Sequence, residues 1–153
     1  MSIMWQYLDK TVATEKALTD YGAMKDIIEH TDEKIRMVHE RMSSIGSPVL
    51  SDMPKGPHNP QATEERYIKG LYEIDVLKER YRQAVEYMEW MEPALASLTE
   101  EERACLETYY WVSYRERGGA IRAIMDYFGI EQSSAYNKKN RALAKLSLLL
   151  YGK

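Results

Sequence analysis

The residues with the clearest chemical potential lie in the stretch GIEQSSAYNKKNRALAKL, residues 129–146. It carries Lys138, Lys139, Arg141 and Lys145, and the sequence has no acidic residue after Glu131. Lysine and arginine side chains bind phosphate oxygens, so a nucleic acid is one expected partner of this run. A solvated basic helix face without any ligand is the alternative explanation.

No group of residues suited to catalysis accompanies this run. The sequence contains no G-x-S-x-G, no glycine-rich phosphate loop and no H-E-x-x-H motif. Cys105 lies among apolar neighbours and is expected to be a small core residue. His30, His39 and His58 are too widely spaced for a zinc site. We therefore predict a protein that is not an enzyme and has no catalytic residue, metal or cofactor.

The composition is that of a folded protein. Hydrophobic residues make up 44% and charged residues 29% of the 153 positions. No stretch approaches the roughly 18 apolar residues of a membrane span, and the N-terminus lacks the pattern of a secretory signal. One cysteine cannot form an intramolecular disulfide. These features predict a cytoplasmic protein that makes no membrane contact.

The formal net charge of −3 is unevenly distributed. Residues 99–153 hold nine basic and seven acidic residues, a balance of +2, whereas residues 1–98 hold twelve and seventeen, a balance of −5. A basic end on a mildly acidic protein indicates an anionic partner at that end.

The elements that must position these residues are helical, because three- and four-residue apolar spacing dominates and strand patterns are absent. We predict an all-α fold whose first helix covers residues 2–44. Its apolar stripe consists of Tyr21, Met24, Ile28, Ile35, Val38, Met42 and Ile45, with a looser pattern before Tyr21. Residues 45–62 contain four prolines and two glycines and are expected to form a loop.

A second helix is predicted over residues 63–91, with Thr63 as its N-cap. Its stripe consists of Tyr67, Leu71, Ile74, Tyr81, Val85 and Met88. Two such helices can fold back as a long antiparallel hairpin, and their narrow stripes leave room for a second copy of the chain. We expect Pro93 to end this helix, which divides the chain into a hairpin domain, 1–92, and a C-terminal domain, 93–153.

The C-terminal domain begins with Thr99 and Glu102, spaced as a capping box. Gly118 and Gly119 are expected to break the chain before a short helix over residues 120–127. Gly129 is expected to end that helix in a left-handed conformation. The next helix is predicted to run from residue 132 or 133 to about 151. Its expected inner face is Ala135, Ala142, Leu143, Leu146, Leu149 and Leu150.

Helix, glycine turn and helix together form the pattern of a DNA-binding helix-turn-helix, whose second helix enters the major groove of double-stranded DNA. Polar residues early in that helix are then the candidates for base contacts: Gln132, Ser133, Ser134, Tyr136 and Asn137. Basic residues are the candidates for phosphate contacts: Arg122, Lys138, Lys139, Arg141 and Lys145.

The segments LTEEERACLETYY (98–110) and AIRAIMDYFGIEQSSAYNKKNRALAKL (120–146) resemble region 4 of bacterial sigma factors, which binds the −35 promoter element. With the loop SDMPKG (51–56) and the end LLLYGK (148–153), they are more similar to late-gene transcription regulators of the RinA and ArpU type from Gram-positive phages. The chain departs from the pattern at Glu131, where Ser or Thr is common, and at Lys138, where the pattern has an aliphatic residue.

This resemblance implies a sigma-region-4-like domain that binds promoter DNA and activates phage late genes in the bacterial host. The hairpin would then provide homo-oligomerisation or contact bacterial RNA polymerase. Two other classes stay open. The same fold can bind RNA polymerase or another host protein without reading DNA, or the chain can be a structural coiled-coil protein whose C-terminus only stabilises a bundle.

Overall fold

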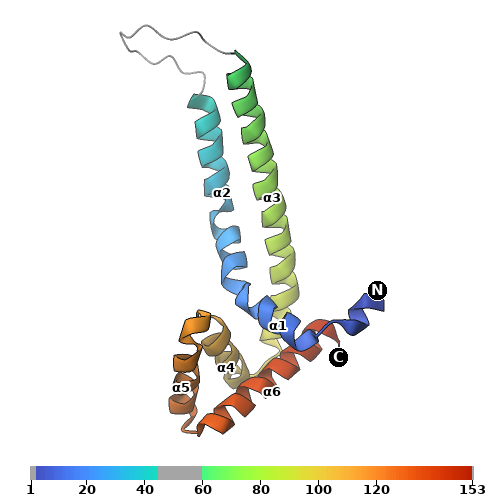
Figure 1. The fold of residues 1–153 in the computed structure, drawn as a ribbon, viewed down its shortest axis with the longest axis vertical. Coiled ribbons are helices and arrows are strands. Elements are labelled where there is room, and N and C mark those ends of the chain that lie inside the picture. Colours follow the sequence, from blue (N-terminus) through green and yellow to red (C-terminus); the bar gives the residue numbers. More distant parts are fainter. Residues whose placement is uncertain (1–2, 45–59, 153) are drawn as a thin grey trace. The chain divides into compact units, whose positions relative to one another are not determined.

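The computed structural model describes residues 3–44 and 60–152 of the 153-residue chain. Every regular element in these two ranges is helical, which confirms the all-α prediction. The elements, drawn in Figure 1, are η1 (Ile3–Tyr7), α1 (Lys10–Thr19), α2 (Tyr21–Ser44), α3 (Pro60–Ala96), α4 (Glu100–Tyr110), η2 (Tyr114–Glu116), α5 (Arg117–Phe128) and α6 (Gln132–Tyr151). Of the predicted loop 45–62, residues 45–59 lie outside the described ranges, and residues 60–62 belong to α3.

The chain divides into two compact units. Unit 1 combines Met1–Met24 with Glu86–Lys153, and unit 2 is Lys25–Val85. This division differs from the predicted boundary at residue 92, because α1 packs against α4 and α6 and takes the first residues of the chain into unit 1.

The predicted single helix over residues 2–44 is three elements. Asp9 caps α1, its carboxylate accepting a hydrogen bond from the Val12 backbone N–H at 3.1 Å. α1 ends at Thr19 with Asp20 as its C-cap, and α2 begins directly afterwards at Tyr21. The looser apolar pattern before Tyr21 therefore belongs to a separate short helix, α1, which packs against α4 and α6.

Two predicted breaks lie inside helices instead. Pro93 does not end α3, which continues to Ala96. Its missing N–H removes one helical hydrogen bond, but the final turn keeps Ala94 and Leu95 buried in the core. Gly118 and Gly119 lie in the first turn of α5, where backbone N–H groups have no partner within the helix and a glycine disturbs the helix least.

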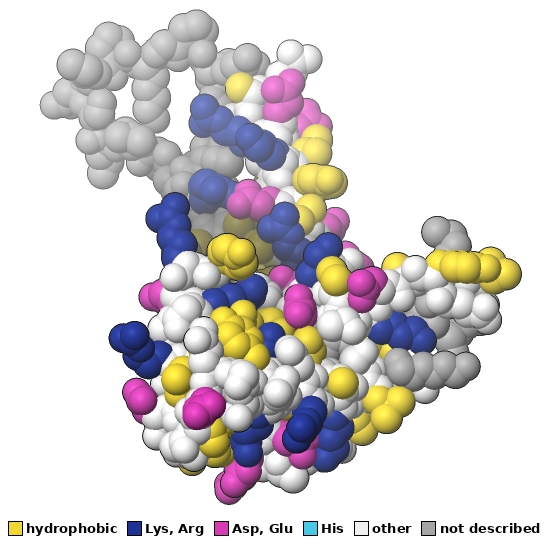
Figure 2. Space-filling view, turned by 60° about the horizontal axis from the view of Figure 1, so that its bottom comes forward, with side chains coloured by type: hydrophobic (Ala, Val, Ile, Leu, Met, Phe, Trp, Pro, Cys, Tyr) yellow, Lys and Arg dark blue, Asp and Glu magenta, His cyan; other side chains and the backbone are white. Residues whose placement is uncertain are grey.

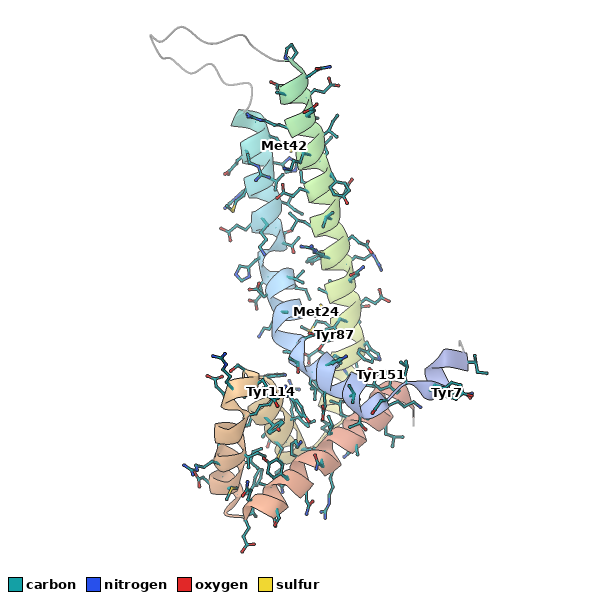
Figure 3. The ribbon with its side chains drawn as sticks, in the orientation of Figure 1. Tyr7, Met24, Met42, Tyr87, Tyr114 and Tyr151 are labelled. Atoms are coloured by element: carbon teal, nitrogen blue, oxygen red, sulfur yellow. The ribbon has the colours of Figure 1, made fainter. Side chains whose placement is uncertain are left out.

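The core of unit 1 joins the two ends of the chain. Its main cluster consists of Leu18, Tyr21, Met91, Ala94, Leu95, Leu98, Leu106, Tyr110, Ala142, Leu143, Leu146 and Leu150. Tyrosine hydroxyls at its edge are satisfied: Tyr21 donates to Glu92, and Tyr87 to the carbonyl of Ala17. Tyr87 and Tyr151, labelled in Figure 3, both make edge contacts with the ring of Trp90.

The inner face of α6 is slightly rotated from its prediction. Ala135, Ala142, Leu143, Leu146 and Leu150 are buried as expected. Leu149 is exposed, and Ser147 is buried in its place. The correction follows from helical geometry, because Ser147 lies four residues after Leu143 and three before Leu150 on the same face.

Unit 2 consists of the parts of α2 and α3 that run side by side in opposite directions (Figure 1). Arg41 donates to Glu73 at 2.5 Å across the pair. Met42, labelled in Figure 3, reaches from α2 to Gly70 of α3, where an added Cβ would lie 2.6 Å from its side chain. Val38 and Ile74 are buried between the helices.

The predicted apolar stripe of α2 is covered, whereas that of α3 is partly exposed. The α2 stripe is covered, with Ile28, Ile35 and Met42 partly buried. On α3 the prediction is wrong for Tyr67, Leu71 and Tyr81, which are exposed, although Ile74, Val85 and Met88 are covered. The α3 helix therefore carries apolar surface that unit 2 itself does not cover.

Candidate nucleic-acid interface

The turn between α5 and α6 is fixed by its glycine. Gly129 has φ 61° and ψ 42°, the left-handed conformation that was predicted for it. Its N–H and that of Ile130 both donate to the carbonyl of Met125, the latter at 3.1 Å. Ile130 then packs against the buried group of Cys105, Ile121, Ile124 and Ala135. The turn therefore sets the angle at which α6 leaves α5.

Cys105 has the predicted role of a small core residue. It is fully buried, and burial raises the pKa of its thiol. A thiol held in its protonated form is a poor nucleophile.

The first two turns of α6 leave the candidate base-contacting residues exposed. α6 begins at Gln132, and its N-cap Glu131 makes no side-chain capping bond. Ala135 is fully buried and holds this part of the helix against the core. The five predicted base contacts are all exposed: Gln132, Ser133, Ser134, Tyr136 and Asn137. The structure thus leaves these five polar side chains exposed over the first two turns of α6.

Two of the predicted phosphate-binding lysines are held by acidic residues of α4. The Lys138 ammonium lies 3.1 Å from a carboxylate oxygen of Glu101 and 4.3 Å from the centre of the Phe128 ring. Lys145 donates to Glu102 at 3.0 Å. Both lysines keep partial exposure, so an external phosphate can reach them only in competition with a carboxylate.

The capping residues of α4 bind the second of these lysines. Thr99 accepts a hydrogen bond from the Glu102 backbone N–H at 3.2 Å, and the Thr99 hydroxyl donates to the Glu102 carboxylate at 3.1 Å. The predicted cap is therefore present. Partial burial acts to raise the pKa of Glu102, but the hydrogen bonds from Lys145 and Thr99 outweigh it and hold that pKa below its ordinary value. Glu102 stays charged and attracts Lys145 at neutral pH.

Lys139 is not an exposed phosphate contact, and that prediction is corrected. Its side chain is 7% exposed, with the ammonium 4.4 Å from the centre of the Tyr109 ring and 3.5 Å from the Tyr110 hydroxyl. The centre of the Tyr136 ring lies 5.8 Å from the same ammonium. Burial lowers the pKa of this ammonium, although the carboxylate of Glu15 acts to raise it. Lys139 is an internal cation surrounded by aromatic rings.

The two remaining candidate phosphate contacts are Arg122 on α5 and Arg141 on α6. Both are exposed, and the described part of the chain shows no ion pair for either. Figure 2 shows lysine and arginine side chains interspersed with acidic ones on the face of unit 1 turned toward the viewer. At this end of the sequence carboxylates of α4 therefore balance Lys138 and Lys145, but not Arg122 or Arg141.

The group around Lys139 was not predicted from the sequence. Tyr110 also hydrogen-bonds Glu15 of α1 at 3.1 Å, and the Arg117 guanidinium lies 5.3 Å from the centre of the Tyr110 ring. Helical spacing could have located Lys139, which lies four residues after Ala135 and three before Ala142 on the inner face. Nothing in the local sequence pairs α4 with Glu15, which is 95 residues away from Tyr110.

A small apolar pocket lies between α4 and α5. Its volume is about 250 Å³, and its lining consists of Ala104, Thr108, Ala123, Ile124, Tyr127 and Phe128. No candidate base-contacting or phosphate-contacting residue lines it.

Residues 3–44 and 60–152 contain no group of three or more His, Cys, Asp or Glu side chains arranged to hold a metal ion. His58 lies outside these ranges. None of the described helices combines the length and apolar content needed to cross a membrane.

Comparison with known proteins identifies no relative: no protein-family model, no curated protein and no solved structure matches the chain.

Proposed function

We propose that the chain is a sequence-specific DNA-binding regulator of transcription, and that α5 and α6 act as a helix-turn-helix with α6 in the major groove. The observation that carries the proposal is the set of exposed polar residues from Gln132 to Asn137, presented directly after the Gly129 turn. Glutamine and asparagine side chains can pair with adenine, and serine hydroxyls bond several base edges. Activation of phage late genes is part of the proposal and rests on the resemblance to RinA- and ArpU-type regulators.

Phosphate contacts in this proposal come first from Arg122 and Arg141, whose guanidinium groups are open to a ligand. Lys138 and Lys145 contribute when phosphates displace Glu101 and Glu102. Lys139 has a different role, because its ammonium contacts Tyr109 and Tyr110 and so holds α6 against α4.

The experiment is selection of binding sites by the full chain from a pool of random double-stranded DNA, followed by fluorescence anisotropy on the enriched sequence. We expect one consensus to emerge and affinity to fall steeply with salt, because bound phosphates release counterions. Arg122→Glu and Arg141→Glu should each lower affinity and reduce the salt slope by about 1. Asn137→Ala should instead relax sequence preference at one position while leaving the salt slope unchanged.

A second candidate function is binding to a protein such as RNA polymerase. The observation that favours it is the neutralisation of Lys138 and Lys145 by α4, together with the apolar pocket beside Tyr127 and Phe128. If the selection enriches no sequence and the chain binds no duplex below about micromolar Kd at low salt, this candidate replaces DNA binding.

A further inference from the structure

Unit 2 exposes a compact apolar patch on α3. Tyr67, Ile68, Leu71 and Tyr72 have exposed fractions of 52%, 57%, 43% and 71%. These residues lie on adjacent turns of one helix face, because positions three and four apart are neighbours. Charged residues bound the patch at both ends of this face, with Glu64 before it and Lys78 after it, both exposed.

Unit 2 has a small apolar core. Among its described residues the buried apolar side chains are Val38, Ile74 and Ala84. Two packed helices each cover one stripe of the other, and a layer of this size rarely supplies enough buried apolar area to be stable by itself. A third helical surface laid on α3 would bury the exposed patch and thicken this core.

We propose that the surface laid on this patch is α3 of a second copy of the chain, packed antiparallel with Leu71 on the two-fold axis. In such an interface a residue n positions before Leu71 lies level with the residue n positions after it in the partner, and the two can meet where both are on the exposed face of α3. Glu64 and Lys78 are each seven positions from Leu71, and Tyr67 and Asp75 are each four. The two-fold axis therefore places carboxylate against ammonium and phenol hydroxyl against carboxylate, each twice.

This self-complementarity favours a second copy over an unrelated partner. Glu64, Leu71 and Lys78 repeat at seven-residue intervals, the spacing that keeps one face of a helix against another along a coiled coil. The charges lie at the two ends of the patch, where they fix register and direction more than affinity. The apolar patch provides the contact area, and the paired charges select the antiparallel alignment about Leu71.

The inference goes beyond the proposed DNA binding and does not depend on it, since self-association is measured without DNA. It adds that the DNA-binding form carries two copies of α6, so its site would contain two related half-sites. Failure to bind DNA would leave the dimer untouched, and a monomeric chain would leave binding of one α6 to one half-site intact.

The register is tested by charge exchange, with the mass of the full chain measured by sedimentation equilibrium. We expect a dimer for the natural chain, a weaker dimer for Glu64→Lys or Lys78→Glu alone, and recovery in the double variant. Residues 64 and 78 are about 21 Å apart along one helix, so recovery cannot arise within a single chain. A natural chain that is monomeric at about 100 μM, or a double variant no stronger than the single ones, overturns the proposal.

A cysteine at the axis provides an independent test. Leu71→Cys should form a disulfide-linked dimer under mild oxidation, because residue 71 meets its own copy at the axis. Cys105 is fully buried and should not react. Met37→Cys on α2, at an exposed position outside the patch, is the matched control and should remain uncrosslinked. Circular dichroism verifies that each variant is folded, and equal crosslinking at positions 37 and 71 contradicts the proposed axis.

Discussion

The Lys138 ammonium and the Glu101 carboxylate lie 3.1 Å apart, joining α6 to the first turn of α4. A phosphate that approaches α6 must compete with this carboxylate for the lysine. Glu101→Gln removes the competing charge and should tighten DNA binding by up to about fivefold, since exposed ion pairs contribute at most about 1 kcal/mol. Anisotropy titration at low salt measures the change.

The control for this variant is Glu100→Gln, which removes the same charge from the adjacent exposed position. If both variants tighten binding equally, the effect comes from net charge and not from release of Lys138. A DNA affinity that falls in Glu101→Gln would show that the ion pair supports the binding conformation.

Lys139 should matter for folding and not for DNA affinity. Lys139→Glu places a carboxylate in a buried site near Glu15 and should lower the free energy of unfolding by about 3 kcal/mol. Lys139→Met keeps the side-chain volume and should leave DNA affinity within about twofold. Arg141→Glu should show the reverse, with unfolding unchanged within about 0.5 kcal/mol and DNA binding reduced. Urea unfolding and anisotropy on the same samples separate the two roles.

The left-handed conformation of Gly129 can be tested by comparison with Gly118, a glycine in the helical conformation. An added Cβ would meet nothing within 4 Å at either Gly129 or Gly118. Gly129→Ala should cost about 1–2 kcal/mol of stability, because φ is 61° there. Gly118→Ala, inside α5, should be neutral or stabilising by up to about 1 kcal/mol. Equal urea midpoints for the two variants would contradict the left-handed turn.

Stability should fall at alkaline pH through Tyr21. Burial and the hydrogen bond to Glu92 raise its pKa to about 12, whereas an unfolded tyrosine ionises near pH 10. Between these values the unfolded chain releases a proton that the folded chain retains, so the free energy of unfolding decreases as pH rises. One such group contributes up to about 1.4 kcal/mol per pH unit in this window, and none of the loss occurs below it.

This loss is measured by urea unfolding from pH 9 to 12, with tyrosinate absorbance as a second signal. Tyr21→Phe should make the alkaline decline shallower. Tyr7→Phe, which removes an exposed phenol from η1, is the control and should leave the decline as it is in the natural chain. A decline of equal slope in all three chains would contradict the assignment to Tyr21.

Local signals predicted local structure well in this chain. The Thr99 cap, the left-handed Gly129 and the start of α6 each depend on a few adjacent residues, and each is present. The break at Asp20 and the continuation through Pro93 were not foreseen, because packing in the unit 1 core decides them and the residues involved lie far apart in the sequence.

For the candidate site, the outward direction of Gln132 and Asn137 followed from helical period alone. The contacts of Lys138 and Lys139 could not be predicted in this way, because their partners lie on another element, α4. These partners are Glu101 for Lys138 and the tyrosines for Lys139. The sequence around a basic helix residue does not indicate whether its side chain will contact a carboxylate or an aromatic ring of another helix.

The composition of unit 1 from Met1–Met24 and Glu86–Lys153 has a consequence for synthesis and truncation. During translation the apolar side of α1, including Leu18, emerges long before α6 is made, so unit 1 can close only after α6 has left the ribosome. For the same reason, a fragment beginning at residue 93 would lose Leu18, Tyr21 and Met91 from its core. The isolated C-terminal segment should therefore express poorly, and a shortened chain used to test DNA binding has to retain residues 1–24.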